Sequence, residues 1–223
     1  MKISIIGTGY VGLVTGTCLA EFGHHVTCID KDADKIDQLL KGQVPIYEPG
    51  LEALVDKNVD EKRLRFTTHL AEAVPEAEAV FIAVGTPTSR RGDGYADLTY
   101  IFEAARELAD NLKGYTVIID KSTGPVGTAR QVERVIRQAN PNADFDVASN
   151  PEFLREGAAI NDFMRPDRVV IGVQTEKARQ VLQEIYKPLF LLDTPIVSTT
   201  IESIGKASWI RIGHRMDRPS QSG

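Results

Sequence analysis

Three glycines near the start of the chain have a spacing that lets backbone approach phosphate closely. Gly7, Gly9 and Gly12 directly follow the apolar stretch 2–6, and a mostly apolar run continues over residues 10–22. The first glycine permits a tight turn, the second lets the backbone approach a pyrophosphate, and the third lets a helix pack closely. Free N–H groups and the dipole at the helix start attract phosphates. The pattern therefore predicts a strand, a turn and an amphipathic helix that bind a dinucleotide.

A carboxylate ends the second predicted strand. Asp30 follows the apolar stretch 25–29 and lies eighteen positions after Gly12, close to the spacing of an acid that binds a ribose hydroxyl. A glycine-rich turn in some other α/β protein is the alternative, but it would not supply both strands and this acid. The carboxylate would accept a hydrogen bond from the 2′-hydroxyl of NAD and repel the 2′-phosphate of NADP, despite the nearby Lys31 and Lys35. We therefore predict NAD as the cofactor.

Hydroxyl side chains follow two later apolar stretches. Thr86 lies in the turn after residues 79–84, and Ser122 and Thr123 follow residues 116–120. Each could simply belong to a turn or cap a helix. Because ligands bind at the carboxyl ends of the strands in open α/β sheets, a hydroxyl at these positions can instead face a cofactor, a substrate or a water.

Two carboxylates follow the sixth predicted strand. Glu152 and Glu156 lie in the segment 150–157, after Pro151 and four positions apart, which would place both on one face of a helix. A solvated helix start is the alternative, since acids are favoured there by the helix dipole. In the functional interpretation, one carboxylate acts as a base or positions a water. Glu156 and the neighbouring backbone then hold a polar substrate.

Alternating strands and helices position these turns. The predicted strands cover residues 2–6, 25–29, 64–67, 79–84, 116–120, 145–149, 168–172 and 195–198. The predicted helices cover residues 10–22, 33–41, 51–57, 98–111, 128–138 and 176–186, with a loop and helix over 150–159. This alternation predicts an α/β fold of the Rossmann type, with a doubly wound, mainly parallel sheet.

The composition is that of an ordinary globular protein. The 223 residues are 42% hydrophobic and 26% charged, and the net charge of −5 provides no attraction to nucleic acid. No apolar stretch reaches the roughly 18 residues of a membrane span, so we expect no membrane partner and a cytoplasmic location. The four histidines show no ligand spacing, which predicts no metal site. Cys18 and Cys28 are expected to be small core residues.

Several motifs in the same order resemble those of the nucleotide-sugar 6-dehydrogenases. They occupy residues 2–13, 45–51, 84–87, 121–128, 150–157 and 165–168. Other NAD enzymes with the glycine motif, such as β-hydroxyacid or hydroxyacyl-CoA dehydrogenases, would not be expected to carry the second and fifth of these. The resemblance implies an NAD-binding Rossmann domain over residues 1–203, with the UDP-binding second domain of the family absent. Gly124 departs from the family pattern, which usually has an aliphatic residue there.

The resemblance also implies roles for individual residues. The implied NAD contacts are Gly7, Gly9, Tyr10, Val11, Gly12, Asp30, Lys35, Thr86, Thr123 and Glu156. The implied substrate-binding residues are Glu152, Phe153, Leu154 and Glu156. Thr123 and Glu152 are implied to be catalytic and to hold a water.

Such enzymes oxidise the C6 alcohol of a sugar nucleotide to a carboxylate by two hydride transfers to NAD. The resemblance implies oxidation of UDP-glucose to UDP-glucuronate, with GDP-mannose or a UDP-N-acetyl sugar as alternative substrates. In the family a cysteine thiol captures the aldehyde before the second transfer. Cys18 and Cys28 lie in the first helix and second strand, where neither is expected to reach the substrate. A chain that is inactive alone, or a non-catalytic NAD-binding module, is therefore a second interpretation.

The last twenty residues depart from the family pattern. Residues 204–223 contain glycines and a proline and show no sustained helical stripe, where the family has a long helix bearing a catalytic lysine. Lys206 is two positions short of that lysine, so we assign it no such role. We expect 204–223 to be a divergent tail, from a truncation or frame shift. The full-length family is expected to form homo-oligomers through the helix replaced here.

Overall fold

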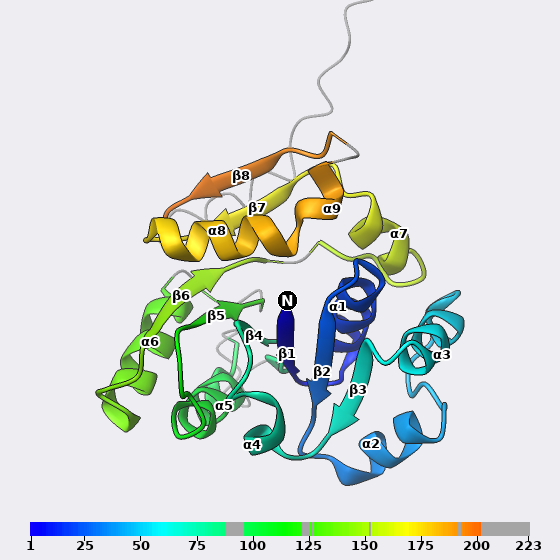
Figure 1. The fold of residues 1–223 in the computed structure, drawn as a ribbon, viewed down its shortest axis with the longest axis horizontal. Helices are drawn as coiled ribbons and strands as arrows, with labels where there is room; N and C mark the ends of the chain where they lie inside the picture. Colours follow the sequence, from blue (N-terminus) through cyan, green and yellow to red (C-terminus); the bar gives the residue numbers. More distant parts are fainter. Residues whose placement is uncertain (88–95, 122–124, 126, 152, 191–192, 202–223) are drawn as a thin grey trace, which may run out of the picture.

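A computed structural model describes residues 1–87, 96–121, 125, 127–151, 153–190 and 193–201. Within these ranges it contains one eight-stranded sheet with the strand order β3-β2-β1-β4-β5-β6-β7-β8 (Figure 1). The strands are β1 (Lys2–Ile6), β2 (His25–Ile29), β3 (Leu64–Thr67), β4 (Ala79–Ile82), β5 (Thr116–Asp120), β6 (Phe145–Ser149), β7 (Val169–Gly172) and β8 (Ile196–Thr199). The predicted α/β, doubly wound, mainly parallel sheet is confirmed.

The strand order reverses beside the first strand. β1 pairs with β2 on one side and with β4 on the other, both in parallel, so the sheet grows outward in both directions from this point. This reversal opens a crevice at the carboxyl ends of the strands, where open α/β sheets bind their ligands. β6 and β7 are antiparallel neighbours, joined at Ser149 and Gly172, and β7 and β8 are again parallel.

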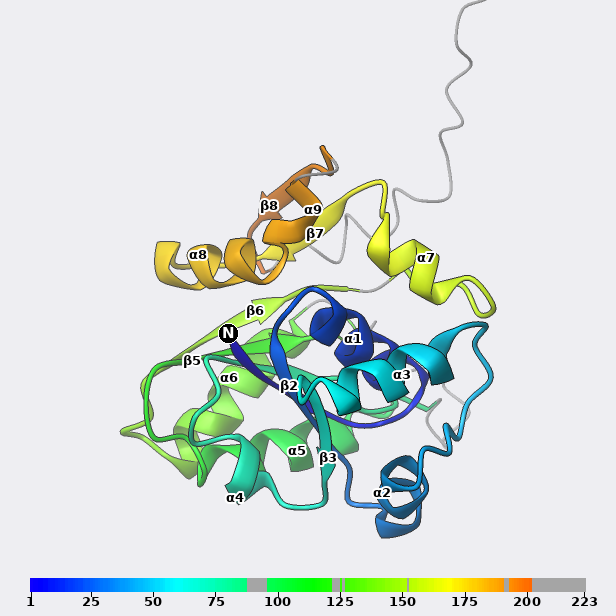
Figure 2. The ribbon, with the colours of Figure 1, turned by 45° about the vertical axis from the view of Figure 1, so that its right-hand side comes forward.

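Helices cover both faces of the sheet (Figures 1 and 2). The helices are α1 (Tyr10–Glu21), α2 (Ala33–Leu40), α3 (Leu51–Asp60), α4 (Leu70–Ala73), α5 (Thr99–Ala109), α6 (Thr128–Ala139), α7 (Ala159–Met164), α8 (Glu176–Ile185) and α9 (Lys187–Phe190). The apolar cluster on one face unites α1, α3, α7 and α8 with alternate strand residues such as Ile5 and Phe81. The cluster on the other face unites α4, α5 and α6 with the intervening residues, such as Val80 and Ile82.

The first helix differs from its prediction. It was expected to be amphipathic, but every residue from Gly12 to Ala20 is buried. The sheet covers one side of α1, while α3 and α7 pack against the others (Figure 2). The helix therefore lies inside the protein, and its sequence signal is the absence of any charged residue between positions 10 and 20.

The segment after β6 also differs from its prediction. Residues 153–158 are not helical, and α7 begins only at Ala159. The expectation that Glu152 and Glu156 share one helical face is therefore wrong. The short helices α4 and α9 were not predicted, and β4 ends at Ile82, two residues earlier than expected.

Some predictions fall outside the described residues. They concern Ser122, Thr123, Gly124, Glu152 and the tail 204–223. Among the helices that are described, none combines the length and the apolar character that crossing a membrane requires. The described side chains also contain no group of three or more histidine, cysteine, aspartate or glutamate residues able to hold a metal ion.

Candidate functional site

The glycine turn joins the end of β1 to the start of α1. Gly7 has a φ of +104°, a conformation that strongly favours glycine, and its N–H donates to the Ile29 carbonyl oxygen at 2.7 Å. A Cβ added to Gly7 would lie 2.7 Å from the carbonyl oxygen of Ala83. A Cβ added to Gly12 would lie 1.9 Å from the Gly7 carbonyl oxygen, so the helix presses directly against the turn. Both glycines are therefore required by backbone contacts.

The third glycine of the turn faces open space. Gly9 is exposed, and a Cβ added to it would meet no atom of the described part of the chain within 4 Å. It occupies the N-cap position of α1, where glycine has no side chain to cap the first turn of the helix. Its carbonyl oxygen accepts the Leu13 N–H at 2.9 Å, which shows that the helix is regular from its start. The N–H groups of the first turn thus meet the requirements of a pyrophosphate, and the backbone leaves room for one.

Asp30 lies at the carboxyl end of β2 and braces the same turn. Its Oδ2 accepts the amide and hydroxyl of Thr8, each at 2.8 Å, and its Oδ1 accepts the Asp32 amide at 3.0 Å. Burial alone would raise the pKa of Asp30, but these bonds and the Lys35 charge hold it below its ordinary value. The carboxylate is therefore ionised at neutral pH, as required to accept a ribose hydroxyl and repel a phosphate.

The turn after β4 lies beside the glycine turn. The Ala83 N–H donates to the Ile6 carbonyl oxygen at 2.9 Å, which extends the pairing of β1 and β4 to the end of both strands. Thr86, half-buried, follows three residues later. The structure therefore brings Thr86 to the same edge of the sheet as the glycine turn and Asp30.

Buried polar groups lie behind the segment that follows β6. The Oδ1 of Asn150 accepts the Lys121 Nζ at 3.1 Å and the Tyr186 hydroxyl, and the Asn150 Nδ2 donates to the Val170 carbonyl oxygen at 2.9 Å. These contacts connect β5, β6, β7 and α8 at the carboxyl edge. Phe153 and Leu154 are half-buried and line a small cavity with Lys121 and Asn150. The residues expected to bind substrate thus rest on a rigid base.

The structure places the remaining expected residues near the same edge. Tyr10 and Val11 begin α1 and are half-buried, and Lys35 lies in α2, where its Nζ is 3.8 Å from the Asp32 carboxylate. Glu156 is exposed and borders an open hollow together with Tyr10.

Glu48 is a residue of this region to which sequence analysis assigned no role. It lies in the loop between α2 and α3 and is 6% exposed, yet it accepts the Tyr10 hydroxyl and the Gly157 N–H, the latter at 2.8 Å. Burial would raise the pKa of Glu48, but the Tyr10 hydroxyl and backbone N–H groups hold it below its ordinary value. Burial, with the Glu48 hydrogen bond and charge, raises the pKa of Tyr10 to about 12. The only local signal was an acid inside a motif of apolar and proline residues.

Neither cysteine lies in the site. Cys18 and Cys28 are both fully buried, and a Cβ added to Gly16 would lie 2.5 Å from the Cys28 Sγ. Burial raises the pKa of each thiol to about 12. A nucleophilic cysteine must be accessible and ionised, so neither of these two thiols is suited to capture an aldehyde.

Comparisons with known proteins agree on one family. The sequence model of the UDP-glucose/GDP-mannose dehydrogenase family, NAD binding domain, matches residues 1–190. The chain is 61% identical to a UDP-glucose 6-dehydrogenase of Rhizobium meliloti over 202 residues, which are 90% of this chain and 46% of that protein.

Solved structures give the same result. A ternary complex of GDP-mannose dehydrogenase from Pseudomonas aeruginosa has a TM-score of 0.88 and 37% identity, covering 95% of this chain and 49% of that one. A UDP-glucose dehydrogenase from Pyrobaculum islandicum has a TM-score of 0.88 and 38% identity, covering 94% and 48%. The chain thus spans about half the length of the relatives that it matches.

Proposed function

The chain belongs to the UDP-glucose/GDP-mannose dehydrogenase family and corresponds to its NAD-binding domain, and from this premise we propose that it binds NAD as one half of a UDP-glucose 6-dehydrogenase. The single observation that carries the proposal is the open glycine turn, in which no atom of the described residues lies within 4 Å of a Cβ added to Gly9 and Asp30 is ionised at the neighbouring strand end. Gly7, Gly12 and the N–H groups at the start of α1 would hold the pyrophosphate. Asp30 would accept the adenosine ribose hydroxyl.

UDP-glucose is the proposed substrate class. The curated relative at 61% identity bears that name, whereas a solved neighbour at 37% identity is a GDP-mannose dehydrogenase. The segment 153–156 would line the sugar-nucleotide site. Thr123 and Glu152 would hold a water there; both lie outside the described residues, and family membership alone supports these two roles.

The proposed reaction is oxidation of the sugar C6 alcohol to a carboxylate. When bound, NAD supplies the acceptor for the hydride. The chain's own residues fix the cofactor, through the glycine turn and Asp30, and present the substrate segment over the buried Lys121–Asn150 pair. The proposed compartment is the cytoplasm, and the proposed assembly of a full-length protein is a homo-oligomer.

A second function is favoured by the burial of both cysteines. Because neither Cys18 nor Cys28 can act as the nucleophile, we propose that the 223-residue chain alone binds NAD without completing the oxidation. In this state it would be an NAD-binding module.

The experiment pairs calorimetric titration of the chain with NAD and NADP with an NADH absorbance assay in the presence of UDP-glucose or GDP-mannose. We expect NAD to bind more tightly than NADP and no sustained NADH formation. Absence of NAD binding at millimolar concentration would contradict the central proposal. Sustained NADH formation would contradict only the second one and would identify the sugar nucleotide.

A further inference from the structure

A single buried carboxylate touches both the cofactor side and the substrate side of the site. Glu48 comes from the loop between α2 and α3, far in sequence from either side. Its Oε2 accepts the hydroxyl of Tyr10, the first residue of α1. The same oxygen accepts the Gly157 N–H at 2.8 Å, and its Oε1 lies 3.4 Å from the Ile160 nitrogen, which donates to it. Glu48 thus connects the helix after the glycine turn to the segment that leads into α7.

The chemistry of these contacts requires a carboxylate. All the partners named are donors, and an ionised carboxylate accepts hydrogen bonds through both oxygens without offering a donor. A buried charge destabilises a protein unless hydrogen bonds satisfy it, and at Glu48 the Tyr10 hydroxyl and the Gly157 and Ile160 N–H groups supply such bonds, which hold its pKa below the ordinary value. Glutamine has the same shape, but its NH₂ group would meet a donor on one side. These contacts therefore favour glutamate over glutamine at position 48, because they require its negative charge as well as its shape.

The Tyr10 side chain also reaches the substrate side directly. Its hydroxyl lies 3.4 Å from the Arg155 carbonyl oxygen. Tyr10, Tyr47, Glu156 and Gly157 border one open hollow, so the residues that Glu48 connects face the same space. A change in the position of Tyr10 is consequently transmitted to the 155–157 backbone through one short path.

We propose that Glu48 is a positioning residue that couples the glycine turn to the 153–157 segment, so that occupation of the turn by NAD orders the segment that receives the sugar nucleotide. The proposal rests on the proposed function. In it, the Glu48 carboxylate holds Tyr10 at the start of α1 and the Gly157 backbone in one arrangement. Loss of the Glu48 charge uncouples the glycine turn from the 153–157 segment. NAD then binds a less ordered turn, and its binding no longer protects the amides of the segment from hydrogen exchange.

The test compares Glu48→Gln with the matched control Glu21→Gln in the full 223-residue chain. Glu21 is also an acid whose carboxylate accepts hydrogen bonds from neighbouring side chains, but it lies at the opposite end of α1. We measure the NAD dissociation constant by calorimetry and the hydrogen exchange of amides 155–160 with and without NAD. We expect Glu48→Gln to weaken NAD binding about fivefold to tenfold and to abolish the NAD-dependent protection. Glu21→Gln should leave both within about twofold of the wild type.

Tyr10→Phe keeps the backbone contacts of Glu48 and serves if Glu48→Gln does not fold. It should reproduce the loss of NAD-dependent protection, and in a Tyr10→Phe/Glu48→Gln double variant the two effects should not add. Equal NAD affinity and unchanged protection in the Glu48→Gln and Tyr10→Phe variants would overturn the coupling, as would an equal loss in Glu21→Gln. If the wild type itself fails to bind NAD, the proposed function fails, which is a different result.

Discussion

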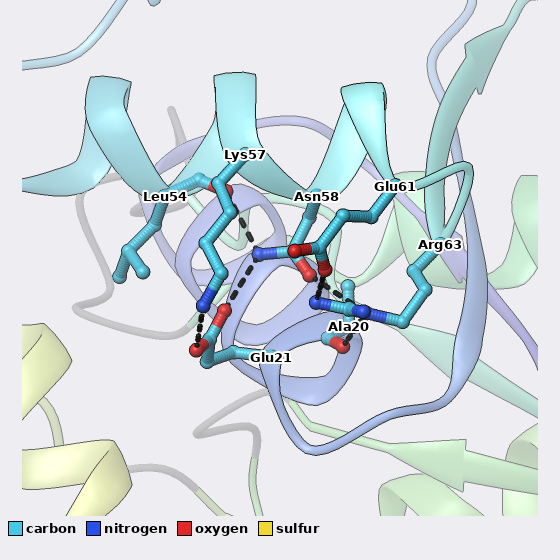
Figure 3. Close-up of polar contacts among 7 residues, drawn as sticks. All are labelled: Ala20, Glu21, Leu54, Lys57, Asn58, Glu61 and Arg63. Carbon is cyan, nitrogen blue, oxygen red and sulfur yellow. Dashed lines mark hydrogen bonds and ion pairs between the residues drawn. The ribbon is translucent and has the colours of Figure 1, made fainter.

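The two ends of α1 have opposite hydrogen-bonding arrangements. At the N-terminal end, the N-cap residue Gly9 has no side chain to cap the first turn, and no atom of the described residues lies within 4 Å of a Cβ added to it. At the C-terminal end, side chains of α3 and of Arg63, the residue before β3, donate hydrogen bonds to Ala20 and Glu21 (Figure 3). The same helix is therefore open where a ligand would bind and closed where it is anchored.

Asn58 is the centre of the closed end. It is completely buried, its Nδ2 donates to the Glu21 Oε2 at 3.0 Å and the Leu54 carbonyl oxygen at 2.8 Å, and its Oδ1 accepts the Arg63 Nε at 3.1 Å. Lys57 adds an ion pair to Glu21 at 2.6 Å. All these partners come from the protein, whereas glycine at the N-cap of the open end supplies no side-chain acceptor to the N–H groups of the first turn. The comparison indicates that a ligand-binding end of a helix can be identified by backbone hydrogen-bonding groups for which the neighbouring side chains provide no partner.

The largest expected effect is a difference between alanine substitutions at two glycines of the open end, measured in stability and in NAD affinity. Gly12→Ala places a Cβ 1.9 Å from the Gly7 carbonyl oxygen, so it should lower the free energy of unfolding by about 3 kcal/mol or more and abolish NAD binding. Gly9→Ala meets no atom within 4 Å and should fold normally, yet lose NAD affinity because its methyl group occupies the approach of the pyrophosphate. Denaturant unfolding and calorimetry measure the two quantities. Normal NAD binding by Gly9→Ala would show that the open space is not the binding site.

The next effect belongs to the closed end. Asn58→Ala should cost about 2 kcal/mol in unfolding free energy, because the half-buried Glu21 Oε2 and the Arg63 Nε each lose one partner, while NAD affinity stays unchanged. Lys57→Ala removes only a partly exposed ion pair and should cost less than about 1 kcal/mol. A parallel loss of NAD affinity and stability in Asn58→Ala would mean that the two ends are not independent.

A smaller effect is expected at Asp30. Asp30→Asn removes the charge that accepts the Thr8 amide and hydroxyl, so NAD affinity should fall about tenfold and the preference for NAD over NADP should narrow. Asp32→Asn is the matched control, because asparagine caps the start of α2 as well as aspartate does. Titration with both cofactors checks the outcome. An unchanged NAD to NADP ratio in Asp30→Asn would remove Asp30 from cofactor selection.

The smallest effect is a pH dependence that appears only at the closed end. His24 follows α1 and is buried, and its Nε2 lies 2.9 Å from the Ile185 carbonyl oxygen, to which it donates. Burial, assisted by the N-terminal ammonium, lowers the pKa of His24 below its ordinary value of 6.5. As the pH falls, His24 is therefore protonated at a higher pH in the unfolded chain than in the folded protein. The free energy of unfolding should consequently decrease as the pH falls below about 6.5.

NAD affinity should stay constant over the same range, because the pKa of Asp30 and that of Glu48 are both held below their ordinary values. Unfolding and calorimetric titrations from about pH 7.5 to about pH 5.5 compare the two ends. His24→Gln should flatten the stability profile, whereas His25→Gln, at an exposed position, should not. A stability profile that is equally steep in His24→Gln would assign the pH dependence to other groups.

Most of the fold could be predicted because it depends on local patterns. The boundaries of β1, β2, β3, β5 and β6 agree with their predictions, since short apolar runs ended by polar turns are typical of buried strands. The segment before α7 was predicted wrongly because side chains outside it accept its backbone N–H groups: Asp162 accepts the Arg155 N–H, and Glu48, 109 positions away in sequence, accepts the Gly157 N–H. The character of α1 was predicted wrongly because α3 and α7 cover the side expected to face water.

The sequence by itself was enough to predict a cofactor site, because Gly7, Gly9, Gly12 and Asp30 contribute backbone conformation, absent side chains and one charge, all of which are local properties. Only the tertiary structure decided which polar groups would meet. Glu48 and Asn58 owe their roles to burial and to donors brought from distant segments, and no sequence spacing encodes such partners. The core positions of Cys18 and Cys28 were predicted from the sequence and are confirmed, whereas the raised pKa of both thiols follows from the packing that excludes water from them.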